Sequence, residues 1–216
     1  MTTDSDLQTR VLAELAWQPR IISGHVGVTA KAGVVTLTGH VETYVQKIAA
    51  EKAALHVRGV SAVVQEIRVR LSSGISHDDD DIAAAAAERL AWDGRLPNDG
   101  IVASVEQGWV TLTGEVGWQY QKQDAERDVH GLSGVIGISN HISLTPRVNA
   151  INLEDDIKRA LRRSWLFDKE GVMVHVDGGK VTLSGSALSS DERDLAVTTA
   201  WSAPGTTDVV NDITIA

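Results

Sequence analysis

Residue types that could carry catalysis or hold a metal are scattered along this chain of 216 residues. Its seven histidines form no H-x-x-x-H or H-E-x-x-H pair, the spacing that places zinc ligands on one face of a helix. Cysteine is missing, which excludes disulfides, zinc-thiolate sites and cysteine nucleophiles. The sequence also lacks a G-x-S-x-G elbow and a Walker loop. We therefore expect neither enzymatic activity nor a cofactor.

Carboxylates are concentrated at one place, Asp78 to Asp81. Several oxygen ligands could hold a divalent cation. Adjacent carboxylates repel one another, however, and this run lacks the spaced ligands and the glycine of a calcium-binding loop. We expect a solvated linker that ends in a helix cap at Asp81, and no metal site.

Basic side chains are distributed unevenly. A net charge of -9 argues against a nucleic-acid-binding surface spread over the protein, so no nucleic acid is expected as a partner. Residues 1–72 hold eight basic and six acidic groups, residues 73–146 four and twelve, and residues 147–216 eight and eleven. Two groups of basic residues are candidates for binding an anionic surface: Lys47, Lys52, Arg58, Arg68 and Arg70 in the first segment, and Lys158, Arg159, Arg162 and Arg163 in the third.

These basic groups allow two interpretations. A basic side chain near an anionic membrane contributes about 1 kcal/mol, so four that converge would give weak, salt-sensitive attachment. Alternatively, they are solvated or pair with acidic residues of the middle segment. Both interpretations stay open at the level of the sequence.

The elements that position these side chains recur three times. A V-T-L-[TS]-G segment appears at intervals of 75 and 71 residues, and another glycine follows each copy 20 residues later. An aspartate precedes a series of apolar residues at i, i+4 and i+8, which predicts a capped amphipathic helix. The landmarks are Asp6, Asp81 and Asp156; Gly39, Gly114 and Gly185; and Gly59, Gly134 and Gly205.

Each copy is predicted to be an α-β-β-α-β unit. Alternating apolar residues indicate strands on both sides of a glycine-containing turn, a helical stretch follows the V-T-L-[TS]-G segment, and a third alternating strand closes the unit. The later glycine is expected to be a left-handed C-cap of the second helix. The hairpin glycines are Gly33, Gly108 and Gly179.

The resulting fold class is α+β, with three tandem units that each have a three-stranded mixed sheet and two helices on one face. A β-α-β crossover is right-handed in nearly all proteins, so the second helix covers one face, and we expect the first helix beside it. The units are predicted at residues 1–73, 78–146 and 150–216. The opposite face of each sheet is expected to be open.

Aromatic and apolar residues on the open face are candidates for an interface. Alternation with Val110 places Trp109 there, and Val34, Val102 and Met173 share that face in their own units. Packing between units or self-association would bury them.

Three further aromatic residues occupy helices. Trp118 and Tyr120 stand at the start of the second helix of unit two, as an interfacial anchor or as a cover of the core. Trp165 continues the apolar stripe of a first helix, so we expect it in the core.

The unit resembles the BON domain, named for bacterial osmotically inducible and nodulation proteins. The resemblance rests on Gly33–Gly39, on Gly59-Val60 and on the matching segments of copy two, and the third copy departs at Lys180, Ser184 and Pro204. It implies a non-enzymatic binding module of the bacterial envelope and stress response. Phospholipid surfaces are the ligand usually proposed for the family, and potassium ions are proposed for some members.

Two functional hypotheses follow, with a third that the sequence does not address. The first is peripheral association with anionic phospholipid, and the second is a scaffold that binds itself or another protein, supporting solute handling under osmotic stress. Potassium sensing would use backbone carbonyls, which leave no side-chain pattern. Relatives are periplasmic, but the chain shows no signal peptide or spanning segment, so we expect a cytoplasmic location, with membrane association under the first hypothesis.

Overall fold

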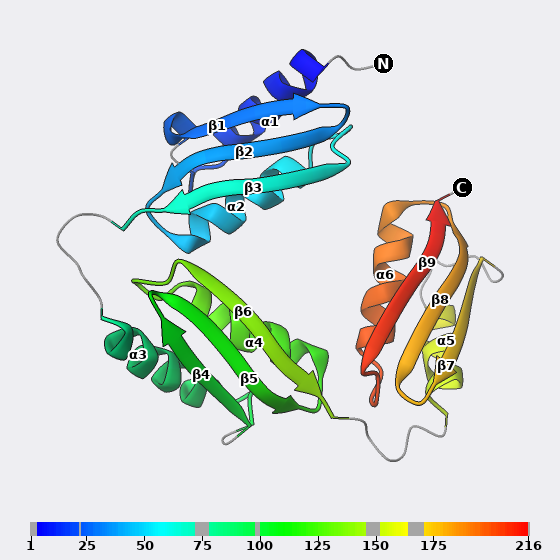
Figure 1. Ribbon diagram of the computed structural model, residues 1–216. Helices are drawn as coiled ribbons and strands as arrows, with labels where there is room; N and C mark the ends of the chain where they lie inside the picture. The colour runs from blue at the N-terminus through cyan, green and yellow to red at the C-terminus, as the bar shows by residue number, and fades with distance from the viewer. Residues whose placement is uncertain are drawn as a thin grey trace. The chain divides into compact units, whose positions relative to one another are not determined.

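The computed structural model describes residues 4–21, 23–71, 78–97, 100–145, 152–163 and 171–215. It contains three α-β-β-α-β repeats, each drawn as a sheet with two helices (Figure 1). Repeat one contains α1 (Asp4–Trp17), η1 (Ser23–His25), β1 (Val26–Lys31), β2 (Val34–Val41), α2 (Tyr44–Leu55) and β3 (Ala62–Val69). Repeat two contains α3 (Asp79–Trp92), β4 (Ile101–Glu106), β5 (Trp109–Val116), α4 (Gln119–His130) and β6 (Gly137–Leu144). Repeat three contains α5 (Leu153–Arg163), β7 (Val172–Asp177), β8 (Lys180–Ala187), α6 (Ser190–Trp201) and β9 (Asp208–Ile215).

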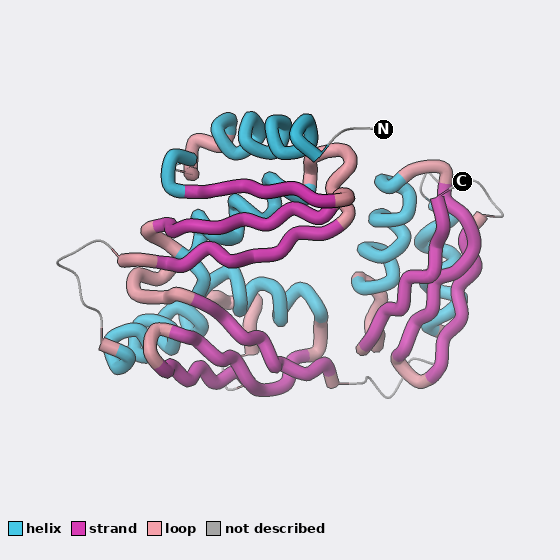
Figure 2. Tube along the Cα trace, turned by 45° about the horizontal axis from the view of Figure 1, so that its top comes forward, coloured by secondary structure: helices cyan, strands magenta, loops and turns pink. Residues whose placement is uncertain are grey.

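Each repeat has its own three-stranded sheet, in the orders β1-β2-β3, β4-β5-β6 and β7-β8-β9. In repeats one and three, the central strand pairs antiparallel with the first strand and parallel with the third. The two helices of a repeat lie on the same face of its sheet, as Figure 2 shows for each repeat taken separately. The predicted fold class is confirmed.

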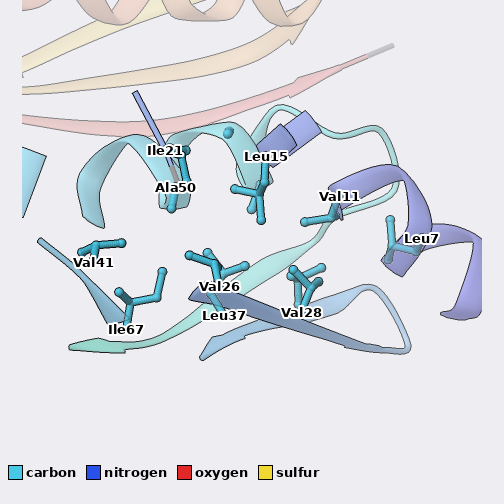
Figure 3. Packing of buried hydrophobic residues seen from close by; sticks show 13 residues of the cluster. Leu7, Val11, Leu15, Ile21, Val26, Val28, Leu37, Val41, Ala50 and Ile67 are labelled. Carbon is cyan, nitrogen blue, oxygen red and sulfur yellow. The ribbon is translucent and has the colours of Figure 1, made fainter. Parts of the chain in front are cut away.

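The core of repeat one lies between its sheet and its two helices (Figure 3). Leu7, Val11 and Leu15 of α1 are buried at the predicted helical spacing, and they meet buried side chains of the central strand such as Leu37. Fully burying a side chain of this size contributes about 1.5–3 kcal/mol, which explains why a helix of only four turns is held on the sheet. Repeat three has the same arrangement, with Leu153, Ile157, Leu161 and Leu183 buried.

The first helix of each repeat begins earlier than predicted. We expected caps at Asp6, Asp81 and Asp156, but the helices begin at Asp4, Asp79 and Leu153. The three aspartates are therefore inside the first turn of their helices. In α3 and α5 the residues before the helix, Asp78 and Asn152, accept the first backbone hydrogen bonds, from Ile82 and Asp156.

The prediction that Asp78 to Asp81 form a linker is wrong for three of the four residues, because Asp79, Asp80 and Asp81 make the first turn of α3. Negative side chains are favourable at this end of a helix. The Asp79 carboxylate also accepts hydrogen bonds from the backbone amides of Gln107 (2.7 Å) and Gly108 (2.8 Å) in the β4–β5 turn. In repeat one, Asp4 accepts a corresponding bond from Ala32 (2.9 Å). In both repeats, an aspartate at the start of the first helix thus holds the hairpin turn by hydrogen bonds.

The later glycine of each copy is not a helix C-cap. Helix α2 ends at Leu55 and its C-cap, His56, has a right-handed helical conformation, whereas Gly59 lies three residues further on. Gly59 does have a positive φ of 98°, as the sequence suggested. It belongs to the turn that leads into β3, where its carbonyl would lie 3.3 Å from a Cβ placed on Gly33 of the hairpin. The two glycines therefore allow the hairpin and this turn to approach closely.

Some predicted positions lie outside the described residues. These are Trp165 and most residues of the two connections between repeats, 72–77 and 146–151.

Candidate functional site

One end of repeat one collects side chains that are far apart in the sequence. Strand β1 starts, and strands β2 and β3 finish, at this end, because β1 is antiparallel and β3 parallel to β2. Helix α1 also finishes at this end (Figure 1), and its last residue is the exposed Trp17. We call this surface the basic end; its residues are Trp17, Arg20, His25, His40, Arg68 and Arg70.

Trp17 is the most exposed of the large apolar side chains in the described part of the chain, at 83% of its full accessible area. Its counterpart in repeat two, Trp92, is 82% exposed at the end of α3. Both follow a buried leucine by two residues, which turns them away from the core. Neither tryptophan is among the interface residues predicted from the sequence. Their spacing of 75 residues is a signal that could have identified them.

The charge of the basic end comes mainly from arginine. Arg20 is exposed in the turn after α1, and Arg68 is exposed on β3, directly beside His40 of β2 in the parallel register. Arg70 follows β3 and is held in place by its backbone amide, which donates to the Val41 carbonyl (2.7 Å). Two exposed acids are near in the sequence: Glu42 follows β2, and Glu66 precedes Arg68 by two residues on β3. The structure therefore places several exposed cations and an exposed indole at the same end of repeat one.

The five basic residues predicted in repeat one do not form a single surface. Lys47 is in the first turn of α2, at the same end as Arg68 and Arg70. Lys52, in the last turn of α2, and Arg58, in the following loop, lie at the opposite end, where the Arg58 carbonyl accepts from Arg10 (2.8 Å). The pattern of charges along the chain could not show this, because α2 runs the length of the repeat.

In repeat three, two of the four predicted basic residues are paired within α5. Lys158 forms an ion pair with Glu154, and Arg159 forms one with Asp156. Arg162 and Arg163 are exposed at the end of the described part of the helix. Arg159 and Arg163 also line an open groove between α5 and α6, together with Asp156 and several uncharged residues. The pairing lowers the charge that this helix can offer to an anion.

The Glu154–Lys158 pair makes a pH-dependent contribution to stability. The hydrogen bond from Lys158 holds the pKa of the Glu154 carboxyl below its ordinary value of 4.5, and burial opposes this only in part. Because the folded-state pKa is the lower one, the contribution is present above pH 4.5 and is lost as the pH falls through the folded-state value. We expect Glu154→Gln to be less stable than the parent protein at pH 7, and the difference to vanish in acid.

Urea unfolding at pH 7, 4.5 and 3 would measure this difference. Asp155→Asn is the matched control, because it removes a neighbouring charge from the same first turn without breaking the pair with Lys158. A difference between parent and Glu154→Gln that stayed constant down to pH 3 would contradict the prediction.

Trp109 lies on the open face of its sheet but is not free of it. Its indole nitrogen donates to the Ser139 hydroxyl on β6 (2.9 Å), and its ring lies over Gly137, where any Cβ would overlap it. The side chain is 45% exposed. Val102 and Met173 are each 63% exposed on the first strands of their sheets, and Val34 is 38% exposed. The predicted interface residues therefore remain accessible, and Trp109 already packs against its neighbouring strand.

Most other side chains on the open faces are polar. On the central strands these positions hold Thr36, Thr38, Thr111 and Thr113. The open faces are consequently less apolar than Trp109, Val102 and Met173 alone suggested.

Trp118 and Tyr120 stand at the start of α4, with their ring centres 6.2 Å apart. Tyr120 is 47% exposed, whereas Trp118 is half-buried. Trp118 precedes α4 at the position that Thr43 and Ser189 occupy as N-caps of α2 and α6. The pair thus covers a helix start and leaves the tyrosine accessible.

Metal-binding clusters and membrane-spanning helices are both absent from the part of the chain that the structure describes. No three His, Asp or Glu side chains gather there as they would around a metal ion. None of the described helices is long and apolar enough to cross a bilayer.

Comparison with known proteins gives a family match in all three repeats. The model of the BON domain matches residues 3–70, 78–146 and 151–216. Osmotically-inducible protein Y of Escherichia coli (strain K12) is 31% identical over 144 residues, which are 64% of this chain and 71% of that protein.

Solved structures resemble the chain only distantly. Two structures of CdsD, a structural protein of the type III secretion system of Chlamydia trachomatis, cover 98% of the chain at 16% and 17% identity. The chain covers 92% and 98% of them, and the TM-score is 0.26 in both cases. That score is too low to support an inference about fold or function.

Proposed function

Because the chain belongs to the BON-domain family, we propose that it is a non-enzymatic binding module of the osmotic-stress response that attaches peripherally to anionic phospholipid surfaces. The connection with osmotic stress follows from its similarity to an osmotically inducible protein. The attachment surface in this proposal is the basic end of repeat one. The observation that carries it is that an exposed tryptophan, Trp17, and three exposed arginines, Arg20, Arg68 and Arg70, lie at the same end of the repeat.

Tryptophan and arginine together suit the surface of a bilayer. The indole is amphipathic and prefers the level of the lipid headgroups, and a basic side chain close to an anionic surface contributes about 1 kcal/mol. Three arginines would thus contribute roughly 3 kcal/mol, which gives weak and reversible binding. The chain as a whole has a net charge of -9. Binding therefore also requires that the acidic repeat two be kept away from the membrane surface.

Flotation with vesicles tests the proposal. We expect the full chain to float with vesicles that contain phosphatidylglycerol and not with pure phosphatidylcholine, and to release when salt is raised from 50 to 500 mM, because the Debye length falls. Arg68→Glu/Arg70→Glu and Trp17→Ala should each weaken binding by about tenfold or more. The matched control is Lys52→Glu/Arg58→Glu, which changes the net charge equally at the opposite end of the repeat.

Two results would contradict the proposed surface. Equal loss in the two double variants would mean that overall charge and not the basic end governs binding. Binding that does not respond to salt would contradict an electrostatic mechanism.

A second candidate function is a self-associating or protein-binding scaffold that uses the open sheet faces. Val102 and Met173, each 63% exposed on those faces, favour it. Light scattering in the same buffers distinguishes the candidates, since a defined oligomer without flotation would support the scaffold.

A further inference from the structure

Two histidines that are distant in the sequence meet at the edge of the first sheet. His25 immediately precedes β1 and His40 follows Gly39 in β2; since Val26 pairs with Gly39, the two histidines are direct cross-strand neighbours. Their ring centres are 4.6 Å apart and their planes differ by 16°. The strand order β1-β2-β3 leaves the His25 side of the pair without a further strand.

The fold itself does not require this pair. Repeat two has Gly100 and Glu115 at the corresponding positions, and repeat three has Gly171 and Ser186, yet both build the same corner. His25 is exposed and His40 is half-buried, so neither is needed to fill the core. The two imidazoles are therefore a feature of repeat one that the shared fold does not require.

The spacing of the rings suits a shared metal ion. Imidazole nitrogens bind Zn²⁺ at about 2.0–2.1 Å, so two imidazoles at ligand angles of about 90–110° have ring centres roughly 4.5–5 Å apart. The observed 4.6 Å lies in this range. In the structure the rings are nearly parallel, so ligation of one ion by both requires side-chain rotation that turns one nitrogen of each ring toward a common point.

The surroundings limit how tightly an ion would be held. Arg68 is next to His40 in the parallel register, and its positive charge opposes a dication. The two histidines leave the remaining coordination positions to water. Such a site would exchange its ion readily, and imidazole ligands favour Zn²⁺, Ni²⁺ or Cu²⁺ over Mg²⁺.

We propose that His25 and His40 form a transition-metal site at the edge of the first sheet. Although His25 and His40 belong to the basic end, metal binding there does not depend on the proposed lipid function. It requires neither a vesicle nor the arginines. A bound dication would add positive charge to the basic end.

The test is a titration of the full chain with Zn²⁺ at pH 7.5, followed by calorimetry and by the NMR signals of the histidine rings. One ion should bind per chain, with the signals of His25 and His40 moving together. His25→Ala and His40→Ala should each weaken binding by at least about tenfold, because each removes one of two linked donors. His141→Ala is the control, since it removes an exposed imidazole from β6 of repeat two.

Acid and Mg²⁺ supply two further readouts. A nitrogen that carries a proton cannot bind a metal, so Zn²⁺ affinity should be lower in acid than at pH 7.5. Mg²⁺ at the same concentration should move neither ring signal. Equal shifts at every histidine, or unchanged binding in His25→Ala, would overturn the site and would leave the lipid proposal untouched.

Discussion

Replacing Gly114 by alanine is expected to lower the free energy of unfolding of repeat two by about 3 kcal/mol or more. Gly114 has a φ of 132°, which residues with a side chain rarely adopt. A Cβ at this position would lie 2.0 Å from the Gly100 carbonyl oxygen, and the neighbouring Glu115 amide donates to that same oxygen at 3.0 Å. The chain would have to break this junction between β4 and β5 to accept the methyl group.

Gly131→Ala is the matched control, because a Cβ at Gly131 meets nothing within 4 Å and its counterparts His56 and Ser202 have side chains. Hydrogen exchange of the β5 amides in the full chain would report the local unfolding free energy in both variants. Similar exchange rates for Gly114→Ala and Gly131→Ala would contradict the expected clash between the new methyl group and the Gly100 carbonyl.

The second large effect is expected at Arg95, which joins the loop after α3 to helix α4. Its guanidinium lies 3.0 Å from a carboxylate oxygen of Asp124 and 2.6 Å from one of Asp93. The side chain of Asp124 is only 6% exposed. Removing the cation would leave this carboxylate poorly solvated, so we expect Arg95→Ala to cost about 2–4 kcal/mol.

Removing the buried carboxylate instead should be far less harmful. Repeats one and three have Ala49 and Leu195 at the position of Asp124, so the helix accepts an apolar residue there. We expect Asp124→Leu to cost less than about 1 kcal/mol, and Arg95→Ala to become milder in its presence. Urea unfolding of the two single variants and the double variant measures the coupling. Equal losses of unfolding free energy in Arg95→Ala and Asp124→Leu would contradict this prediction.

Sequence periodicity was sufficient to predict the architecture. Three copies of the same landmarks and buried positions with periods of 3.6 and 2 predicted the α-β-β-α-β unit and its helix-covered sheet, and the structure confirms both. These patterns predict the elements correctly because each one depends only on which side of a single helix or strand is buried. Helix starts were less predictable. Asp6 and Asp81 resembled caps, but tertiary contacts of Asp4 and Asp79 with the hairpin turns accompany the earlier starts.

The candidate site could be predicted only in part. Arg68 and Arg70 were recognised as basic candidates, but grouping them with Lys52 and Arg58 was wrong, because α2 separates the two ends by its own length. His25 and His40 are 15 residues apart and follow no helical or metal-binding spacing. They meet only because two antiparallel strands place them opposite each other.

By itself the sequence determined the family, the repeat and the residues that fill each core, since all three depend on local order along the chain. Tertiary structure alone decided which distant side chains come together: His40 with Arg68, His25 with His40, and Arg95 with the buried Asp124. The physical reason is that strand register and helix direction bring together residues whose separation in the sequence carries no period.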